Sequence, residues 1–291
     1  MRCPLCGSEK GRIKYRIERF DPQFDIRECG VCRFQYRDLN GVSAYSFYDK
    51  DYYEGGAEFT YLDERTLEDA SRIVWRARMK ALTKRDKSGA EVPCFLDVGC
   101  SFGGLMKVAE ENSYRAFGVE VSEYSGGFAK ERFGVDRVFV GSVEDIELPD
   151  NTFSAVTMIE VIEHIADPAK ALRNICRSLK PGGVVLIQTA DMHGIQAKMA
   201  GGNYHYYLPG HLSYFDRTNL RKLLLASGFS RTKYIGGVEF GLLPKLLKSR
   251  ASFSKFSDYI KWVRISFYHW LSKITVGPLH LTSSMVYLAW K

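Results

Sequence analysis

The stretch Phe95-Leu-Asp-Val-Gly-Cys-Ser-Phe-Gly-Gly-Leu105 decides the fold of this chain. An apolar run from Cys94 to Val98 is broken by Gly99, Gly103 and Gly104, after which apolar residues recur at helical spacing. This pattern predicts a buried strand, a glycine-rich turn and the start of a helix. Glycines in such a turn let the backbone approach a ligand closely, and the N–H groups of the helix N-terminus point toward that ligand.

A second apolar run, residues 116–119, follows the predicted helix and ends at Glu120. In doubly wound α/β folds, an acid at the end of the second strand is well placed to bind ribose hydroxyls. The NAD fingerprint requires Gly-x-Gly-x-x-Gly, whereas this chain has Gly99-x-Ser101-x-Gly103. A dinucleotide site therefore fits less well, and a tight turn in an unrelated α/β protein is the alternative.

Strands and helices continue to alternate after Glu120. We expect helices over 122–133, 169–179 and 217–226, and strands over 137–140, 154–159, 184–189, 231–235 and 281–290. Because the strands are apolar and separated by helices, they predict an α/β fold with a sheet covered on both faces.

The segment Asp97-x-Gly99-x-Ser101-x-Gly103 resembles motif I of the class I S-adenosylmethionine (SAM) methyltransferases, Asp-x-Gly-x-Gly-x-Gly, with Ser101 at the middle glycine. Three later segments look like those of small-molecule methyltransferases: Leu148-Pro-Asp-Asn-Thr-Phe153, Glu160-Val-Ile-Glu-His164 and Leu179-Lys-Pro-Gly-Gly183. The resemblance implies a Rossmann-like, doubly wound sheet of seven strands whose last strand is antiparallel.

The resemblance also implies SAM as cofactor. Glu120 would bind the ribose, Val143 and Glu144 the adenine, and Glu160 would lie near the methionine moiety. An acid that relatives often carry at the position of Ser142 is missing. The complete set of cofactor-binding residues that we expect is Asp97, Gly99, Cys100, Gly103, Glu120, Val121, Val143, Glu144 and Glu160.

Four of the seven cysteines form two Cys-x2-Cys pairs near the N-terminus, Cys3 with Cys6 and Cys29 with Cys32. Two thiolate pairs on turns can complete a tetrahedral Zn²⁺ site, so we expect a zinc ribbon. Two disulfides are the alternative, which is disfavoured because no secretory signal is visible. A site with four thiolates has no open position, and the zinc would be structural.

We expect three parts: a zinc ribbon over residues 1–40, an aromatic and helical connector over 41–92, and a methyltransferase domain over 93–291. The connector tyrosines either cap the cofactor pocket or pack between ribbon and core. We expect a basic helical insertion at 237–278, between the last two strands. Between Gly241 and Gly277 it holds seven cations and one anion, which is +6 of the chain's net charge of +7.

The segment Asn203 to Phe215 follows the fifth strand and contains two histidines and four tyrosines. It lies at the carboxyl edge of the sheet, where open α/β folds bind ligands. Its His211-Leu-Ser-Tyr-Phe215 part resembles a His-Leu-x-x-Phe segment of methyltransferases that modify polysaccharides and sugars. We take His211 and His164 as candidate catalytic bases, because histidine titrates near neutral pH. Capping of a helix by His164, or a loop hydrogen bond by His211, remains open.

These observations predict a SAM-dependent methyltransferase for a small-molecule or lipid-linked acceptor, with a sugar or cell-surface glycan precursor favoured. The alternative is a methyltransferase for ribosomal RNA or another nucleic acid, since a net positive charge suits phosphate. Against that alternative, the charge is concentrated in one predicted helix. A scaffold with an inactive methyltransferase fold is the third possibility.

The location of the protein is inferred from two absences and one charged segment. With no secretory signal and no run of 18 apolar residues, we expect a cytoplasmic protein. Residues 241–277 are predicted to contain a basic amphipathic helix with an aromatic face, which suits peripheral contact with the inner face of an anionic membrane. Packing of that helix on its own domain is the other interpretation.

Overall fold

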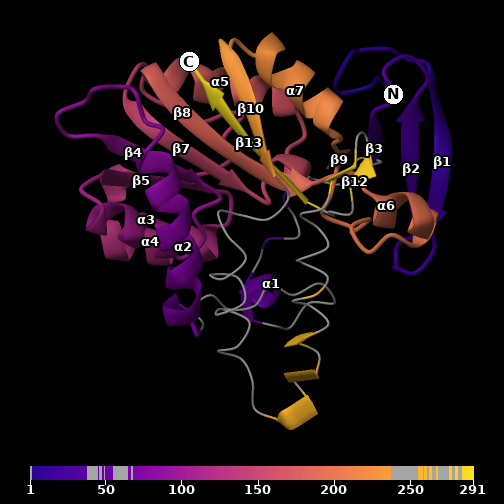
Figure 1. The fold of residues 1–291 in the computed structure, drawn as a ribbon, viewed down its shortest axis with the longest axis horizontal. Coiled ribbons are helices and arrows are strands. Elements are labelled where there is room, and N and C mark those ends of the chain that lie inside the picture. Colours follow the sequence, from indigo (N-terminus) through magenta and orange to yellow (C-terminus); the bar gives the residue numbers. More distant parts are fainter. Residues whose placement is uncertain are drawn as a thin grey trace.

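A seven-stranded sheet with the order β10-β13-β8-β7-β4-β5-β6 forms the centre of the molecule (Figure 1). The computed structural model describes residues 2–37, 45, 48, 50–54, 65–66, 68–236 and 284–291, with short pieces at 255–257, 259–260, 262–263, 267, 275–276 and 279–280. The strands of this sheet are β4 (Cys94–Val98), β5 (Arg115–Glu120), β6 (Val138–Val140), β7 (Phe153–Ile159), β8 (Leu179–Ala190), β10 (Arg231–Gly236) and β13 (Ser284–Trp290).

Within this sheet, β13 runs antiparallel to both of its neighbours, β8 and β10, and the pairs from β8 to β6 are parallel. The predicted Rossmann-like sheet with an antiparallel last strand is therefore confirmed. Two apolar clusters fill its two faces. One contains residues of α5 (Pro168–Ser178) and α7 (Arg217–Ala226), and the other contains residues of α2 (Glu68–Thr83), α3 (Gly104–Glu111) and α4 (Glu123–Phe133).

The helices and strands lie close to their predicted ranges, and the largest difference is at the start of β8. The segment Lys180-Pro-Gly-Gly183, which separates the helix predicted over 169–179 from the strand predicted over 184–189, belongs to β8. Gly182 has a positive φ of 77°, and the β7–β8 register shifts between Phe153 and Ala155, so the strand accommodates this segment as an irregular start. The smaller elements are α1 (Lys50–Glu54), α6 (Ile195–Ala200), η1 (Val135–Arg137), η2 (Ile162–His164), η3 (Gly201–Asn203), β11 (Thr275–Val276) and β12 (Leu279–His280).

The N-terminal residues form a second sheet that includes a strand from the other end of the fold. Its order is β1 (Gly11–Ile17), β2 (Phe24–Cys29), β3 (Gln35–Arg37) and β9 (Ser213–Tyr214), and all its pairs are antiparallel. The β9 strand lies in the segment 203–215 that was predicted to form the substrate loop. The cysteine-bearing part of the chain is thus joined to that loop by main-chain hydrogen bonds.

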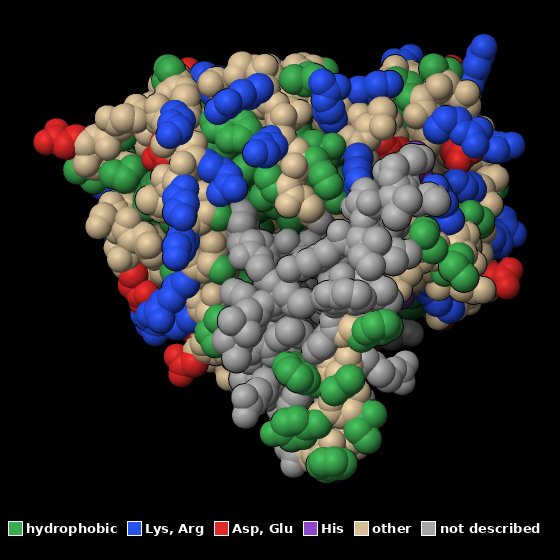
Figure 2. All heavy atoms as spheres, viewed as in Figure 1, with side chains coloured by type: hydrophobic (Ala, Val, Ile, Leu, Met, Phe, Trp, Pro, Cys, Tyr) green, Lys and Arg blue, Asp and Glu red, His purple; other side chains and the backbone are tan. Residues whose placement is uncertain are grey.

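Most of the predicted insertion and part of the predicted connector lie outside the described residues, and the three domain boundaries stay predictions. The described pieces of 256–267 are helical, and they carry large exposed side chains: Phe256 (82% exposed), Tyr259, Ile260, Val263 and Phe267. Figure 2 shows hydrophobic side chains gathered at the lower end of the molecule in this view. In the part of the chain that the structure describes, no helix is long and apolar enough to cross a membrane.

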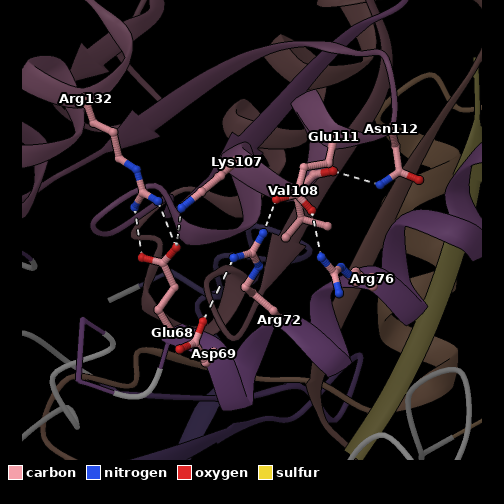
Figure 3. A network of polar contacts seen from close by, with 9 residues as sticks. All are labelled: Glu68, Asp69, Arg72, Arg76, Lys107, Val108, Glu111, Asn112 and Arg132. Atoms are coloured by element: carbon pink, nitrogen blue, oxygen red, sulfur yellow. Dashed lines mark hydrogen bonds and ion pairs between the residues drawn. The ribbon is translucent and has the colours of Figure 1, made fainter.

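Helix α2 is held against α3 and α4 by ion pairs and by one aromatic side chain. Figure 3 shows Glu68 with Lys107 and Arg132, and Glu111 with Arg72 and Arg76. Such partly exposed pairs each contribute little to stability. The closer constraint is steric, because the Trp75 ring of α2 packs directly on Gly104, where α3 begins. A Cβ at Gly104 would lie 2.2 Å from that ring.

We predict that Gly104→Ala lowers the free energy of unfolding by about 1–3 kcal/mol, because the added methyl group overpacks the contact with Trp75. Gly127→Ala in α4 is the matched control, since no atom lies within 4 Å of its Cβ position. There alanine should stabilise the helix by about 0.5–1 kcal/mol. Chemical unfolding measures both changes, and equal effects of the two substitutions would contradict the packing described here.

Candidate active site

The turn between β4 and α3 has the backbone that its glycines predict. Gly99 and Gly103 have φ angles of 76° and 80°, and Ser101 lies between them at 49°. All three are in the left-handed region, which glycine occupies most easily. Ser101 therefore takes the left-handed conformation without being glycine. The N–H groups of Gly99 and Cys100 donate to the carbonyl oxygen of Val119, at 2.8 and 3.1 Å, which ties the turn to the end of β5.

The carboxylate of Glu120 connects this turn to the elements around it. Its oxygens accept hydrogen bonds from the N–H of Ser101 at 2.8 Å, the N–H of Ser122 at 3.0 Å and the hydroxyl of Tyr53 at 3.2 Å. The side chain is almost fully buried, and burial raises its pKa. A neighbouring link lies on β4, where Asp97 accepts from the Thr157 hydroxyl of β7 at 2.6 Å.

A cavity of ≈ 280 Å³ opens at the carboxyl ends of β4, β5 and β7. This is the edge of the sheet at which open α/β folds bind ligands. Most of the residues predicted to bind a cofactor line the cavity, namely Asp97, Gly99, Cys100, Glu120, Val121, Val143 and Glu160, and one predicted base, His164, lines it with them.

Three residues predicted to belong to the site are not among the residues that line the cavity: Gly103, Glu144 and His211. Gly103 faces the Phe133 ring, which would lie 2.4 Å from its Cβ, so packing explains the glycine. The Glu144 carboxylate accepts from the Ser142 hydroxyl at 2.7 Å, from the Tyr45 hydroxyl and from the N–H of Asp167. His211 lies one layer behind His164, with 4.5 Å between the ring centroids.

Several lining residues were not predicted individually as site residues. Tyr45, Tyr48, Tyr52 and Tyr53 of the predicted connector line the cavity, which favours capping over packing between ribbon and core. Trp75, Arg78 and Gln188 also line it. Among the described residues, the buried Ser101 Oγ and Gln188 Oε1 have no hydrogen-bond partner. Because both residues line the cavity, a polar ligand bound there would satisfy these two atoms.

The two candidate histidines are held in the same manner. His164 Nδ1 lies 2.9 Å from the carbonyl oxygen of Gly210, and His211 Nδ1 lies 2.8 Å from that of Tyr206. Because a carbonyl oxygen only accepts, each Nδ1 carries the proton and each Nε2 keeps its lone pair. The Tyr48 hydroxyl lies 2.6 Å from His164 Nδ1 as well.

Burial affects the charge of both imidazoles and of the carboxylate beside them. It lowers the pKa of His164, and burial together with the neighbouring His164 holds the pKa of His211 well below its usual range. Burial also raises the pKa of Glu163, which accepts hydrogen bonds from the Thr189 hydroxyl at 3.0 Å and from Tyr206. Both imidazoles are therefore neutral at neutral pH.

Glu160 ends β7 in an unusual backbone conformation. Its φ is 53°, in the left-handed region that a non-glycine residue rarely occupies, and such conformations cluster at functional sites. Its carboxylate accepts from Gln188 Nε2 at 2.9 Å and from the Tyr206 hydroxyl at 3.2 Å. The side chain thus joins the cavity wall to the buried group around Glu163.

The four N-terminal cysteines lie together as predicted. All are free, and their sulfur atoms lie within 4.8 Å of one another, with 3.6 Å between Cys3 and Cys32 and between Cys6 and Cys29. Tetrahedral zinc with Zn–S bonds of about 2.3 Å needs sulfur atoms about 3.8 Å apart. The geometry of the four sulfur atoms therefore fits a zinc ion.

A family model described as a methyltransferase domain matches residues 66–233. A probable S-adenosylmethionine-dependent methyltransferase from Mycolicibacterium smegmatis is 25% identical over 174 residues, which is 60% of this chain and 66% of that protein. The ubiquinone biosynthesis O-methyltransferase of Caulobacter vibrioides is 31% identical over 125 residues, which is 39% of this chain and 49% of that protein. The chain spans about half the length of the curated relatives it matches.

Solved structures share the fold at low sequence identity. The Haemonchus contortus phosphoethanolamine N-methyltransferase 2 in complex with SAM has a TM-score of 0.56 and 21% identity, over 88% of this chain and 62% of that one. A SAM-dependent methyltransferase from Archaeoglobus fulgidus has a TM-score of 0.52 and 18% identity, over 76% and 95% of the two chains. These likenesses concern the arrangement of the sheet and helices.

Proposed function

The chain belongs to the methyltransferase family whose domain matches residues 66–233, and we propose that it transfers a methyl group from SAM to a small-molecule or lipid-linked acceptor. The acceptor that we favour is a sugar or a cell-surface glycan precursor. The observation that carries the proposal is the buried Glu120 carboxylate beside a left-handed turn, in a cavity that also holds unpartnered polar atoms among its described residues.

The residues present suit SAM. Glu120 would bind the ribose hydroxyls, and it can keep both of its N–H bonds because each carboxylate oxygen accepts two hydrogen bonds. Val143 would contact the adenine, while Glu144, held by Ser142 and Tyr45, would shape that end of the pocket. Glu160 would lie near the methionine moiety. The sulfonium of SAM supplies the leaving group, so the protein must align the acceptor with the methyl carbon and exclude water.

We predict that Glu120→Ala weakens SAM binding by about 1.5–3 kcal/mol, because the ribose loses hydrogen bonds to a charged group. Isothermal titration calorimetry measures this change. Glu123→Ala, which removes an exposed acid three residues away, is the control and should leave the affinity unchanged. Equal SAM affinity in the wild type and in Glu120→Ala would refute the assignment of the ribose site.

The polar wall of the cavity supports a small acceptor. Tyr48, Tyr52 and His164 line it beside Glu160, and aromatic rings with a few fixed polar groups are typical of small-molecule sites. One of the relatives named above is an O-methyltransferase of ubiquinone biosynthesis. An acceptor in ribosomal RNA or another nucleic acid is not favoured, because nearly all of the chain's excess positive charge is concentrated in one segment of the sequence, residues 241–277.

One of the two histidines would accept the acceptor's proton as the methyl group is transferred. His164 lines the cavity, and His211 contacts it from behind, with both Nδ1 atoms fixed on carbonyl oxygens. The lone pair on Nε2 is then available to a hydroxyl or amine. His211 is the less accessible of the two, and His164 would meet the acceptor first.

We predict that replacing the catalytic histidine by alanine lowers turnover by roughly 10²–10⁴, the usual contribution of general base catalysis, while SAM binding is kept. His164→Ala and His211→Ala are compared with His205→Ala, which removes an exposed imidazole from the same segment. Methyl transfer is measured with a panel of sugar and phenol acceptors. Full turnover in both single variants would show that no histidine base is used.

The four cysteines would bind one structural Zn²⁺. The support is the spacing of two Cys-x2-Cys pairs and the sulfur separations of 3.6 Å, which suit a tetrahedral ion. Four thiolates leave the ion no open position for catalysis. Cys3 and Cys29 belong to the same apolar cluster as Phe215, so the ion would stabilise the sheet that includes β9. Intact disulfides in the purified protein would contradict this role.

The last part of the proposal is peripheral contact with a membrane. Its support is the +6 charge of residues 241–277, known from sequence, together with the exposed Phe256, Ile260 and Val263. A basic segment with apolar side chains on its surface suits an anionic lipid surface. Most of this segment lies outside the described residues.

We predict that the protein co-sediments with anionic vesicles at low salt and less at high salt, because each cation near the surface contributes about 1 kcal/mol and salt screens it. Phe256→Ser with Val263→Ser should reduce the binding that remains at high salt, since that part is apolar. Neutral vesicles are the control. Equal, negligible sedimentation under all conditions would make a water-soluble acceptor the better choice.

A further inference from the structure

We propose that Glu163, His164 and His211 form a binding site for a divalent transition-metal cation such as Zn²⁺, beside the cofactor cavity and separate from the four cysteines. One nitrogen of each imidazole and one oxygen of the carboxylate all lie within 4.8 Å of one another. Glu163 and His211 are buried and His164 is partly buried. Two imidazoles and one carboxylate are a donor set that binds zinc and neighbouring divalent metals.

The hydrogen bonds of the two imidazoles are those of metal ligands. In metal sites the ring nitrogen that does not bind the ion usually donates to a carbonyl or carboxylate, which fixes the ring and its tautomer. Here His164 Nδ1 donates to Gly210 and His211 Nδ1 donates to Tyr206, both through main-chain carbonyl oxygens. Both Nε2 atoms therefore keep a lone pair, and neither ring can turn without losing its hydrogen bond.

The carboxylate is oriented in the same way. Thr189 Oγ1 donates to one oxygen of Glu163 at 3.0 Å, and the Tyr206 hydroxyl donates to the other. A fully buried carboxylate without a cationic partner is costly. In the described part of the chain, the side chains that hydrogen-bond with Glu163 are those of Thr189, Tyr206 and Glu160, and none of them is a cation. A divalent ion between the carboxylate and the imidazoles would supply the missing positive charge.

The position of the cluster gives the ion access to the acceptor. His164 and Glu160 line the cavity, and the Tyr206 hydroxyl lies 3.2 Å from Glu160 while it contacts Glu163. An ion held by three protein ligands keeps at least one open position. We place the acceptor's hydroxyl oxygen there, a consequence that rests on the proposed methyl transfer and makes the acceptor an alcohol or phenol.

Metal binding would change the proton step. The ion lowers the pKa of a bound hydroxyl, whose proton leaves to water, and the resulting oxygen anion attacks the methyl carbon. An O–C bond forms as the S–C bond of SAM breaks, and S-adenosylhomocysteine leaves. An Nε2 atom that binds the ion cannot also accept the proton. The metal-loaded enzyme would therefore use the ion where the metal-free enzyme uses an imidazole.

The experiment titrates Co²⁺ into the full-length protein, after its thiolate site has been loaded with Zn²⁺ and weakly held metal has been removed. Cobalt bound by thiolates gives intense sulfur-to-metal charge transfer, whereas cobalt bound by imidazole and carboxylate gives only weak ligand-field bands. We expect one further Co²⁺ per chain with weak bands alone. His211→Ala and Glu163→Gln should weaken this binding at least ~10-fold, and His205→Ala should not change it.

Two results would overturn the proposed metal site, and a third measurement tests the proposed function separately. Uptake of cobalt at the thiolate site alone in the wild type would overturn the proposal, and the cluster would then be a hydrogen-bonded imidazole pair. Equal cobalt affinity in the wild type, Glu163→Gln and His211→Ala would overturn it as well. SAM affinity, measured on the same samples, tests the proposed function separately, because a protein that binds SAM but no second cobalt keeps the methyltransferase assignment and loses only the metal site.

Discussion

The buried carboxylate of Glu120 is the interaction on which the site depends. It accepts N–H bonds from Ser101 in the turn after β4 and from Ser122 before α4. A buried carboxylate must be paired with donors, so these bonds fix both loops relative to the end of β5. The Tyr53 hydroxyl, from α1, reaches the same carboxylate. The Glu120 side chain therefore connects the turn after β4, the end of β5 and helix α1, which covers the cavity.

The loop that contacts His164 behind the cavity wall is held by the N-terminal sheet. Strand β9 pairs with β3, and Arg37 N donates to the carbonyl oxygen of Leu212, next to His211. The Tyr214 hydroxyl donates to the carbonyl oxygen of His211 itself, at 2.9 Å. The cysteine-bearing sheet thus supports the loop that carries His211. Loss of the ion proposed at the cysteines would then disturb the acceptor side of the cavity through this loop.

Local patterns in the sequence were enough to predict the strand, turn and helix at residues 94–111, the acid at Glu120 and the order of the elements. In each case the signal is contained within about twenty residues, because hydrophobic period and glycine position are local properties. The position of Ser101 illustrates this, since the turn keeps its left-handed backbone although the expected glycine is absent.

What the sequence did not reveal depends on contacts between distant segments. Trp75 lines the cavity from α2, and β9 at Ser213–Tyr214 completes a sheet whose first strand begins at Gly11. Nothing in the sequence around Glu163 marks it as a site residue. It lies close to His211 only because the segment 203–215 folds back against it. Glu144 is predicted to contact adenine, and local pattern cannot show that its carboxylate accepts hydrogen bonds from Ser142 and Tyr45.

The central claim, that the cavity at the ends of β4, β5 and β7 is the cofactor site, is tested most directly by a crystal structure with S-adenosylhomocysteine. We expect the ligand in this cavity, with its ribose hydroxyls on the Glu120 carboxylate and the N–H bonds from Ser101 and Ser122 retained. Density for the ligand elsewhere, or in the cavity without contact to Glu120, would contradict the account.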